Sequence, residues 1–185
     1  MELSVFKRET KGRSALTQLR ARGYIPAVIY NKNQDSYPVY LELAAFEKVL
    51  RSVAKNHLSS TVFSLSIDGK VEKAVIKEVQ YNKTTYTPIH IDFLTGSDED
   101  FVNVKIPIEC KNQADSIWSK LGGVLRMPIR SYKVRCKMGS VPASFSVDVE
   151  KMEIGDTKRL EDITLPEGVS PLVNVKEVAV AIAKR

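Results

Sequence analysis

The chain has 185 residues, of which 43% are hydrophobic and 27% charged, a composition typical of a folded protein rather than a disordered one. No apolar run approaches the ~18 residues that a membrane helix needs. The first residues also lack the apolar centre of a secretory signal. We therefore expect a cytoplasmic protein with no membrane partner.

The net charge of +6 is distributed unevenly along the chain. Residues 1–22 contain six Lys and Arg but only two acidic residues, whereas residues 95–185 are nearly balanced, with 14 basic and 13 acidic residues. A basic segment favours an anionic partner such as nucleic acid. A solvated face that keeps the protein soluble is the alternative, and charge alone does not distinguish the two.

The first half of the chain alternates between β and helical patterns. In chain order we expect strands over 3–8, 25–30, 37–42, 60–67, 71–81 and 88–93, and helices over 15–22 and 44–55. Ser14 is expected to cap the first helix and Gly23 to end it. The Asp68-Gly69 pair predicts a hairpin turn.

Both helices have an apolar face that predicts which side chains they bury. In the first helix these residues are Leu16 and Leu19, while Arg13, Thr17 and Arg20 form a polar stripe. The second helix is expected to bury Phe46, Val49, Leu50 and Val53.

The segment TGSDED at 95–100 is the best domain boundary, because small and acidic residues separate two stretches of clear alternation. We divide the chain there into domains 1–94 and 95–185. In the second domain the sequence pattern predicts strands over 101–110, 129–138, 143–149 and 173–183, with turns or short connections at 121–125, 154–156 and 166–169. The fold class is therefore mainly β with a few helices.

The two cysteines fall on the apolar faces of predicted strands. Cys110 ends the alternation that starts at Val102, and Cys136 follows Tyr132 and Val134. We expect both to be buried small hydrophobes, since a disulfide is out of place in a reducing cytosol.

Catalysis finds little support in the sequence. The chain has two histidines and no phosphate-binding loop, dinucleotide motif, zinc spacing or nucleophile elbow. His90 and Asp92 resemble an acid–base pair, but side chains two apart on a strand are separated by roughly 6–7 Å and do not hydrogen-bond by default. We therefore expect no enzyme, no metal and no cofactor.

RNA binding needs cations on a rigid frame together with flat or hydrogen-bonding side chains. The cations expected to contact phosphates are Lys7, Arg8, Lys11, Arg13 and Arg20, five of the six in the basic segment. Suitable partners for bases are Tyr24, Tyr30, Gln80, Tyr81 and His90. Each also has an ordinary structural explanation: a cation near a helix end suits the dipole, and Tyr24 suits packing under the helix end.

The order of the motifs resembles a known family. SALTQLRARGYIPAVIYN, then VIKEVQYNKTTYTPIHIDF, then GGVL and LPEGV, are similar to the bacterial large-subunit ribosomal proteins that bind 5S rRNA. The resemblance is to their long two-domain form, also called the general stress protein CTC type. It implies an N-terminal β-barrel flanked by helices, a β-rich C-terminal domain, and no catalysis.

The resemblance also implies the partners. These are the loop E region of 5S rRNA, bound chiefly through its minor groove, and other large-subunit ribosomal proteins, with a monomer away from the ribosome and no small-molecule substrate. Family contacts match this sequence at Lys7, Arg8, Leu19, Arg20, Tyr30, Gln80, His90 and Asp92. With Lys11, Arg13, Ser14 and Tyr81 added from the sequence itself, these form the expected RNA-binding surface. A stress-linked protein-interaction module is the alternative function.

Three positions depart from the family pattern. Thr17 and Gln18 stand where arginines are usual, and Tyr81 follows Gln80 where an arginine is usual. We expect a weaker or more salt-sensitive affinity, or compensation elsewhere, for example by stacking of Tyr81 or by Lys83. Asn31 replaces a glycine after Tyr30 and is compatible with a left-handed turn.

A second basic cluster is visible without the family. It comprises Arg126, Arg130, Lys133, Arg135 and Lys137, of which the last three share an outward strand face. Two interpretations are open. The cluster is either a solvated face that discourages edge pairing or a second contact with rRNA or a ribosomal protein.

Overall fold

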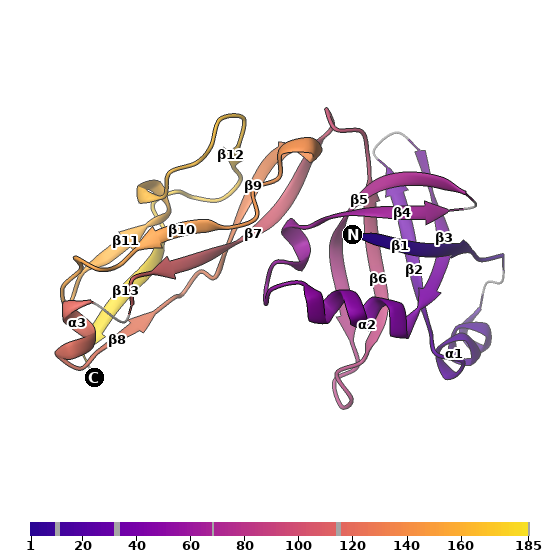
Figure 1. Ribbon diagram of the computed structural model, residues 1–185, viewed down its shortest axis with the longest axis horizontal. Coiled ribbons are helices and arrows are strands. Elements are labelled where there is room, and N and C mark those ends of the chain that lie inside the picture. Colours follow the sequence, from indigo (N-terminus) through magenta and orange to yellow (C-terminus); the bar gives the residue numbers. More distant parts are fainter. Residues whose placement is uncertain (10–11, 32–33, 68, 114–115, 185) are drawn as a thin grey trace. The chain divides into compact units, whose positions relative to one another are not determined.

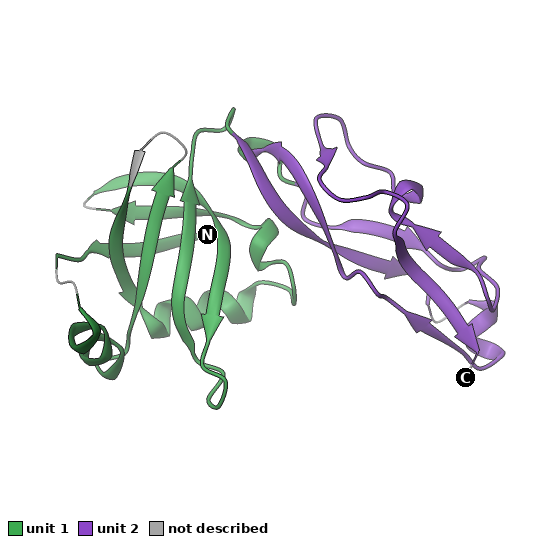
Figure 2. Cartoon of the chain, turned by 180° about the vertical axis from the view of Figure 1, so that it is seen from behind, with its two compact units in different colours: residues 1–100, 138–141 green, residues 101–137, 142–185 purple. Residues whose placement is uncertain are grey.

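The computed structural model describes every residue except 10–11, 32–33, 68, 114–115 and 185 (Figure 1). It divides the chain into two compact units, shown in different colours in Figure 2. Unit 1 comprises residues 1–100 and 138–141, and unit 2 comprises residues 101–137 and 142–185. Both units are built mainly from strands, so the expected fold class is confirmed.

Unit 1 is a closed six-stranded barrel with the strand order β1-β3-β2-β6-β5-β4. The strands are β1 (Glu2–Lys7), β2 (Tyr24–Asn31), β3 (Gln34–Glu42), β4 (Val62–Ile67), β5 (Lys70–Tyr81) and β6 (Pro88–Thr95). Two pairings are parallel, β1 with β4 and β2 with β6, and the others are antiparallel. Closure leaves no unpaired sheet edge, and it confirms the predicted barrel.

The barrel core follows from the alternation of apolar residues along each strand. On β2 the inward side chains are Ile25, Ala27 and Ile29, each at most 1% exposed. Their neighbours Val28 and Tyr30 lie on the outer wall and are half-buried. Asn31 is the last residue of β2 and pairs with Gln34 of β3. Tyr30 therefore points away from the barrel core.

Helix α1 (Arg13–Ala21) begins earlier than the sequence pattern predicts. Ser14 is its second residue, Gly12 occupies the N-cap position, and no side chain caps the helix. The prediction that Ser14 is the cap is therefore wrong, because the chain enters the helix through a glycine with a φ of 131°. Leu16 and Leu19 are half-buried and lie outside the barrel core.

Helix α2 (Leu43–Ser52) supplies one fully buried side chain, Phe46, to the barrel core. Val49 and Leu50 pack against that core, as their spacing predicts. Val53 is the C-cap residue rather than part of the buried helix face. A short 3-10 helix, η1 (Leu58–Ser60), then leads into β4.

The hairpin between β4 and β5 agrees with the turn predicted at residues 68–69. Ile67 pairs with Lys70 across an antiparallel register, and Gly69 has a φ of 83°. The prediction for Asp68 lies outside the described residues.

Unit 2 contains two sheets, in the orders β10-β7-β9-β12 and β11-β13-β8. Its strands are β7 (Phe101–Lys111), β8 (Gly123–Arg126), β9 (Ser131–Lys137), β10 (Phe145–Asp148), β11 (Thr157–Arg159), β12 (Ser170–Pro171) and β13 (Val178–Lys184). Helix α3 (Ile117–Lys120) and the 3-10 helices η2 (Met138–Ser140) and η3 (Leu160–Asp162) complete the elements, η2 belonging to unit 1.

The segment 121–125, predicted as a turn, is partly a strand. Gly123 begins β8, which pairs with β13. A Cβ at Gly123 would lie 3.0 Å from the carbonyl oxygen of Trp118 and 3.3 Å from Ile182. The glycine thus permits close packing of β8. A Gly-Gly pair in a sequence is compatible both with such packing and with a turn, so the sequence alone does not tell them apart.

The two cysteines differ in burial, although both are free thiols. Cys136 is fully buried, as predicted, whereas Cys110 is half-buried and its thiol lies 3.8 Å from the sulfur of Met127. Burial raises the pKa of both thiols, so both are protonated at neutral pH.

Gly23 ends α1 as predicted and gives a direct test of this unit. Its φ is 82°, and an added Cβ would meet nothing within 4 Å. We predict that Gly23→Ala lowers the free energy of unfolding of unit 1 by about 1 kcal/mol, because only the backbone conformation is penalised. Gly23→Asn should lose less, since asparagine tolerates this conformation. Urea denaturation measures both, and equal losses would contradict the assignment.

Candidate nucleic-acid interface

A β-bulge in β5 decides which way the predicted glutamine points. The register with β6 shifts between Ile76 and Glu78, so Ile76 pairs with Phe93 but Glu78 pairs with Asp92. The extra residue, Lys77, reverses the alternation: Val79 packs against the core, and Glu78 and Gln80 are exposed on the outer wall. Without the bulge, Gln80 would point into the barrel.

The register of β6 between its two neighbours gathers four predicted residues on this outer wall. Gln80 of β5 pairs directly with His90 of β6, and Val28 of β2 pairs with Asp92. Tyr30 lies two residues further along β2, on the same face as Val28. We call the set Tyr30, Glu78, Gln80, His90 and Asp92 the outer-wall patch.

His90 and Asp92 contact one another within this patch. His90 Nδ1 lies 2.8 Å from Asp92 Oδ1, and the two side chains are 25% and 31% exposed. The expected separation of roughly 6–7 Å is therefore wrong, because side chains on a strand lean along it and so close the distance between alternate residues. The expectation that the pair forms no hydrogen bond is confirmed. The atoms are not aligned as a hydrogen bond, and Nδ1 has no such partner among the described residues.

Tyr30 keeps its phenolic proton in the surroundings of this patch. Burial, followed by the negative charges of Asp92 and Glu78, raises the pKa of Tyr30. A hydroxyl that stays protonated donates and accepts hydrogen bonds. The patch therefore combines a hydroxyl, an amide, an imidazole and two carboxylates on three adjacent strands.

Arg20 fastens α1 to the same wall. Its Nε donates a hydrogen bond of 3.1 Å to the carbonyl oxygen of Ile89, the residue before His90. A guanidinium carries five N–H donors, so four donors are left for a partner. The structure thus brings Arg20 next to the outer-wall patch, as the sequence predicts.

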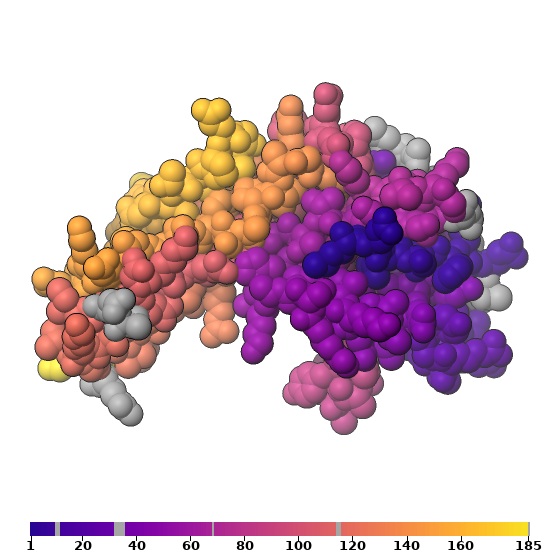
Figure 3. Space-filling model, in the orientation of Figure 1, coloured from indigo at the N-terminus to yellow at the C-terminus, as the bar shows by residue number. Residues whose placement is uncertain are grey.

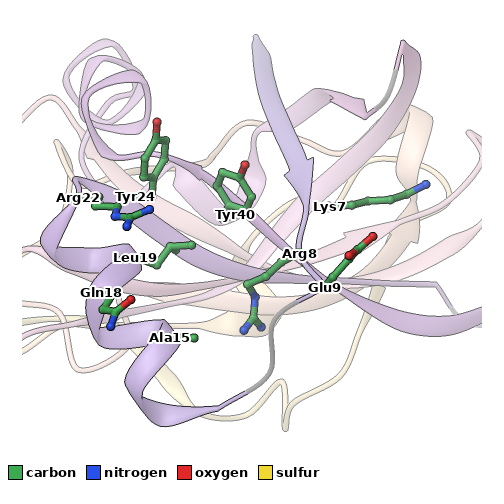
Figure 4. Close-up of a pocket in the computed structure, with 9 residues that line it drawn as sticks. All are labelled: Lys7, Arg8, Glu9, Ala15, Gln18, Leu19, Arg22, Tyr24 and Tyr40. Carbon is green, nitrogen blue, oxygen red and sulfur yellow. The ribbon is translucent and has the colours of Figure 1, made fainter.

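A second group of predicted residues surrounds an open hollow between α1 and the end of β1, shown in Figure 4. We call it the basic hollow. Its lining residues are Lys7, Arg8, Glu9, Ala15, Gln18, Leu19, Arg22, Tyr24 and Tyr40. Three cations against one carboxylate give it a net positive charge, which suits a phosphate.

The floor of the basic hollow is aromatic. The rings of Phe6 and Tyr40 stack with their centroids 5.5 Å apart, and Tyr24 meets Tyr40 edge-on at 5.4 Å. Tyr24 is thus half-buried and packs against Tyr40, which agrees with its ordinary explanation as a packing residue. Phe6 remains 48% exposed at the end of this row.

The remaining predicted residues lie at the margins. Arg13 and Ser14 are exposed at the start of α1, and Lys11 lies outside the described residues. Tyr81 is 44% exposed at the end of β5. It begins the turn between β5 and β6, which stands out from the surface of unit 1 (Figures 1 and 3) and carries the 79% exposed Tyr86.

Sequence reasoning missed three residues of these surfaces. Arg22 was counted only as part of the basic segment, yet it lines the hollow. Tyr40 was not named, although Val39 and Leu41 alternate around it and place it outward. Glu78 was missed because its direction depends on the bulge, for which the sequence carries no clear signal.

Comparison with known proteins decides the family. Residues 3–93 match the model of the Ribosomal L25p family, and residues 101–185 match that of the Ribosomal protein TL5, C-terminal domain. Relatives named large ribosomal subunit protein bL25, from Chlamydia abortus and Chlamydia trachomatis serovar D, are 40% identical over all 185 residues, which is 100% of both chains.

The chain belongs to the ribosomal L25p family. The resemblance inferred from the sequence motifs, including the long two-domain form, is confirmed. As an L25p protein the chain is a structural ribosomal protein and not an enzyme. No helix within the described parts of this L25p chain is long and apolar enough to cross a membrane.

The environment of Tyr30 gives a prediction that needs no RNA. Because Asp92 and Glu78 favour the neutral phenol, Asp92→Asn should lower the pKa of Tyr30, and Glu78→Gln should lower it less. Burial alone keeps the pKa above its ordinary value in the double variant. A pH titration followed by NMR of the Tyr30 ring measures this pKa, and an unchanged midpoint in Asp92→Asn would disprove the electrostatic effect of Asp92.

Proposed function

We propose that the protein is a structural component of the large ribosomal subunit that binds 5S rRNA in its loop E region. Residues 1–94 form the RNA-binding domain, and other large-subunit proteins are its neighbours. The observation that carries the proposal is the convergence of Tyr30, Gln80, His90 and Asp92 on one wall of the barrel. Nothing in the barrel core requires these polar side chains to lie together.

The chemistry of the outer-wall patch selects the part of RNA that it meets. Asp92 and Glu78 repel phosphates, so this patch faces groups that donate hydrogen bonds. The shallow minor groove of RNA offers 2′-hydroxyls and base edges, including the amino group of guanine. Carboxylates accept from these donors, while Gln80 and the Tyr30 hydroxyl both donate and accept. Minor-groove recognition is therefore the geometry that this patch favours.

In this proposal the phosphates of the RNA bind beside the outer-wall patch rather than on it. The cations of the basic hollow and Arg20 flank the wall at the α1 end of the barrel. Arg13 begins a helix that has no acidic residue in its first turn, which favours an anion there. Phosphate contacts would set the orientation of the RNA, and the wall would read its groove.

The basic hollow offers a replacement for one of the two arginines that are usual in the family at positions 17 and 18. Gln18 lines the hollow, and Arg22 lies one helical turn further along the chain. Arg22 is therefore placed to supply the charge absent at Gln18. Thr17 instead bonds back to the carbonyl oxygen of Arg13 at 3.1 Å, and it offers no replacement.

A binding experiment with Gln80→Ala tests the proposal. The wild-type chain should bind 5S rRNA more tightly than an unrelated hairpin of equal length. Gln80 is exposed, so its replacement should leave the thermal melt unchanged. Loss of a base-edge contact should weaken 5S rRNA binding by roughly 1–3 kcal/mol. Gel-shift titration at a fixed salt concentration measures both affinities.

The matched control is Gln113→Ala, which removes an exposed glutamine of unit 2. It should leave 5S rRNA binding unchanged. Equal wild-type affinity for 5S rRNA and the hairpin would overturn the proposal. A large drop in melting temperature with binding preserved in Gln80→Ala would show that Gln80 is part of the scaffold.

A further inference from the structure

Where β7 and β9 pair in unit 2, the charged residues of their outer face are all basic. The exposed residues of β7 over this stretch are Phe101, Asn103 and Lys105, which pair with Lys137, Arg135 and Lys133 of β9. Glu109 of β7 is also exposed, but it lies beyond the residues that pair with β9. We call Lys105, Lys133, Arg135 and Lys137 the β7–β9 cation face. The opposite face of the same strands is buried core, including Val104, Ile106 and Val134.

This face differs from the basic cluster that the sequence predicts. Arg126 lies on β8, which belongs to the other sheet. Lys105, which the sequence cluster did not include, pairs directly with Lys133. Register between two strands, and not closeness along the chain, therefore defines the charged surface.

The charges of this face have no acidic partner among the described residues. No ion pair joins Lys105, Lys133, Arg135 or Lys137 to an acidic group in the part of the chain that the structure describes. Directly opposed like charges on neighbouring strands destabilise a sheet. Lys105 and Lys133 thus carry a cost that folding alone does not explain.

Protection against edge pairing accounts for only part of this face. Lysines serve that purpose at unpaired sheet edges, and β10 pairs with β7 only at residues 108–111, beyond Lys105. Arg135, by contrast, pairs with Asn103 of β7 on one side and with Ser170 of β12 on the other. Its side chain therefore stands on the face of the sheet, where a partner would approach broadside.

Arg135 is held in place on this face by an aromatic ring. Its guanidinium carbon lies 5.1 Å from the ring centroid of Phe101, which is itself 41% exposed. A cation over an aromatic face is attracted to it and gives up part of its freedom before any partner arrives. An ordered guanidinium suits the fork geometry of phosphate oxygens.

We propose that the β7–β9 cation face is a second RNA contact, one that binds the sugar–phosphate backbone without reading sequence. Alternate residues on a strand stand roughly 7 Å apart, comparable to neighbouring phosphates of one RNA strand. The row Lys133, Arg135 and Lys137 therefore matches one backbone, with Lys105 beside it. Of the six exposed side chains that this pairing presents, four are cations and none is acidic, so the contact favours phosphates over base edges.

Two triple variants of the full chain distinguish an effect of this face on RNA affinity from an effect of net charge. Lys105→Gln/Lys133→Gln/Lys137→Gln removes three cations of the face, and Lys120→Gln/Lys151→Gln/Lys176→Gln removes three exposed lysines elsewhere in unit 2. The probe is a fully paired RNA duplex without an internal loop. Its affinity is measured across a salt series for both variants and the wild type, with thermal melts as the folding control.

The face variant should reduce the slope of log affinity against log salt by about two to three, since each phosphate contact contributes about 0.9. Its low-salt affinity should fall about 10-fold or more, while the control variant should stay near wild type. Equal losses in both variants, or none in either, would overturn the proposal. Unchanged duplex binding with lost incorporation into large-subunit particles would also overturn it, by assigning the face to a protein neighbour.

The duplex experiment tests the β7–β9 cation face independently of the 5S rRNA proposal. Gln80→Ala should leave the duplex slope unchanged, because Gln80 is uncharged and contacts no phosphate in that scheme. Loss of 5S rRNA specificity with a normal response of the face variant would refute the first proposal alone.

Discussion

The register of β6 between β2 and β5 is the constraint on which the candidate site depends. Residues alternate between core and solvent along a strand, so a slip by one residue would send every outer-wall side chain into the barrel. Parallel pairing of Ala27 with Ile91 fixes β6 on one side. On the other side the bulge at Lys77 brings Gln80 outward, opposite His90.

The same closed barrel separates two kinds of chemistry on unit 1. Hydrogen-bonding and acidic side chains occupy the outer-wall patch, and cations gather at the basic hollow near α1. Arg20 links them, because its bond to the Ile89 carbonyl oxygen holds the helix against the start of β6. The barrel thus fixes the cations that attract RNA relative to the polar groups that contact its groove. Specific binding needs both in defined positions.

Strand patterning predicted much of this arrangement. The alternation of apolar residues along β2 and β6 leaves Tyr30, His90 and Asp92 outside the core, and the glycine at position 23 marked the end of α1. The family resemblance supplied the barrel but not its strand order, since two parallel pairings between distant strands leave no local trace in a sequence. The direction of Gln80 agreed with the expectation only because of a bulge that the pattern did not reveal.

The failures have physical causes of their own. Ser14 looked like a cap, but a glycine conformation before Arg13 starts the helix instead. The Gly122-Gly123 pair looked like a turn, although Gly123 serves close packing of a strand. The contact of His90 with Asp92 depends on side-chain direction, which spacing along a strand does not specify. Lys105 joined the second basic face through a pairing 28 residues away in the sequence.

Hydrogen–deuterium exchange of the full chain, alone and with 5S rRNA, tests the central claim most directly. If the outer wall and α1 bind this RNA, protection should concentrate in residues 13–31 and 78–92, and β4, which carries none of the proposed contacts, should exchange unchanged. Protection confined to β4 or to unit 2, with β2, β5 and β6 unaffected, would contradict the account.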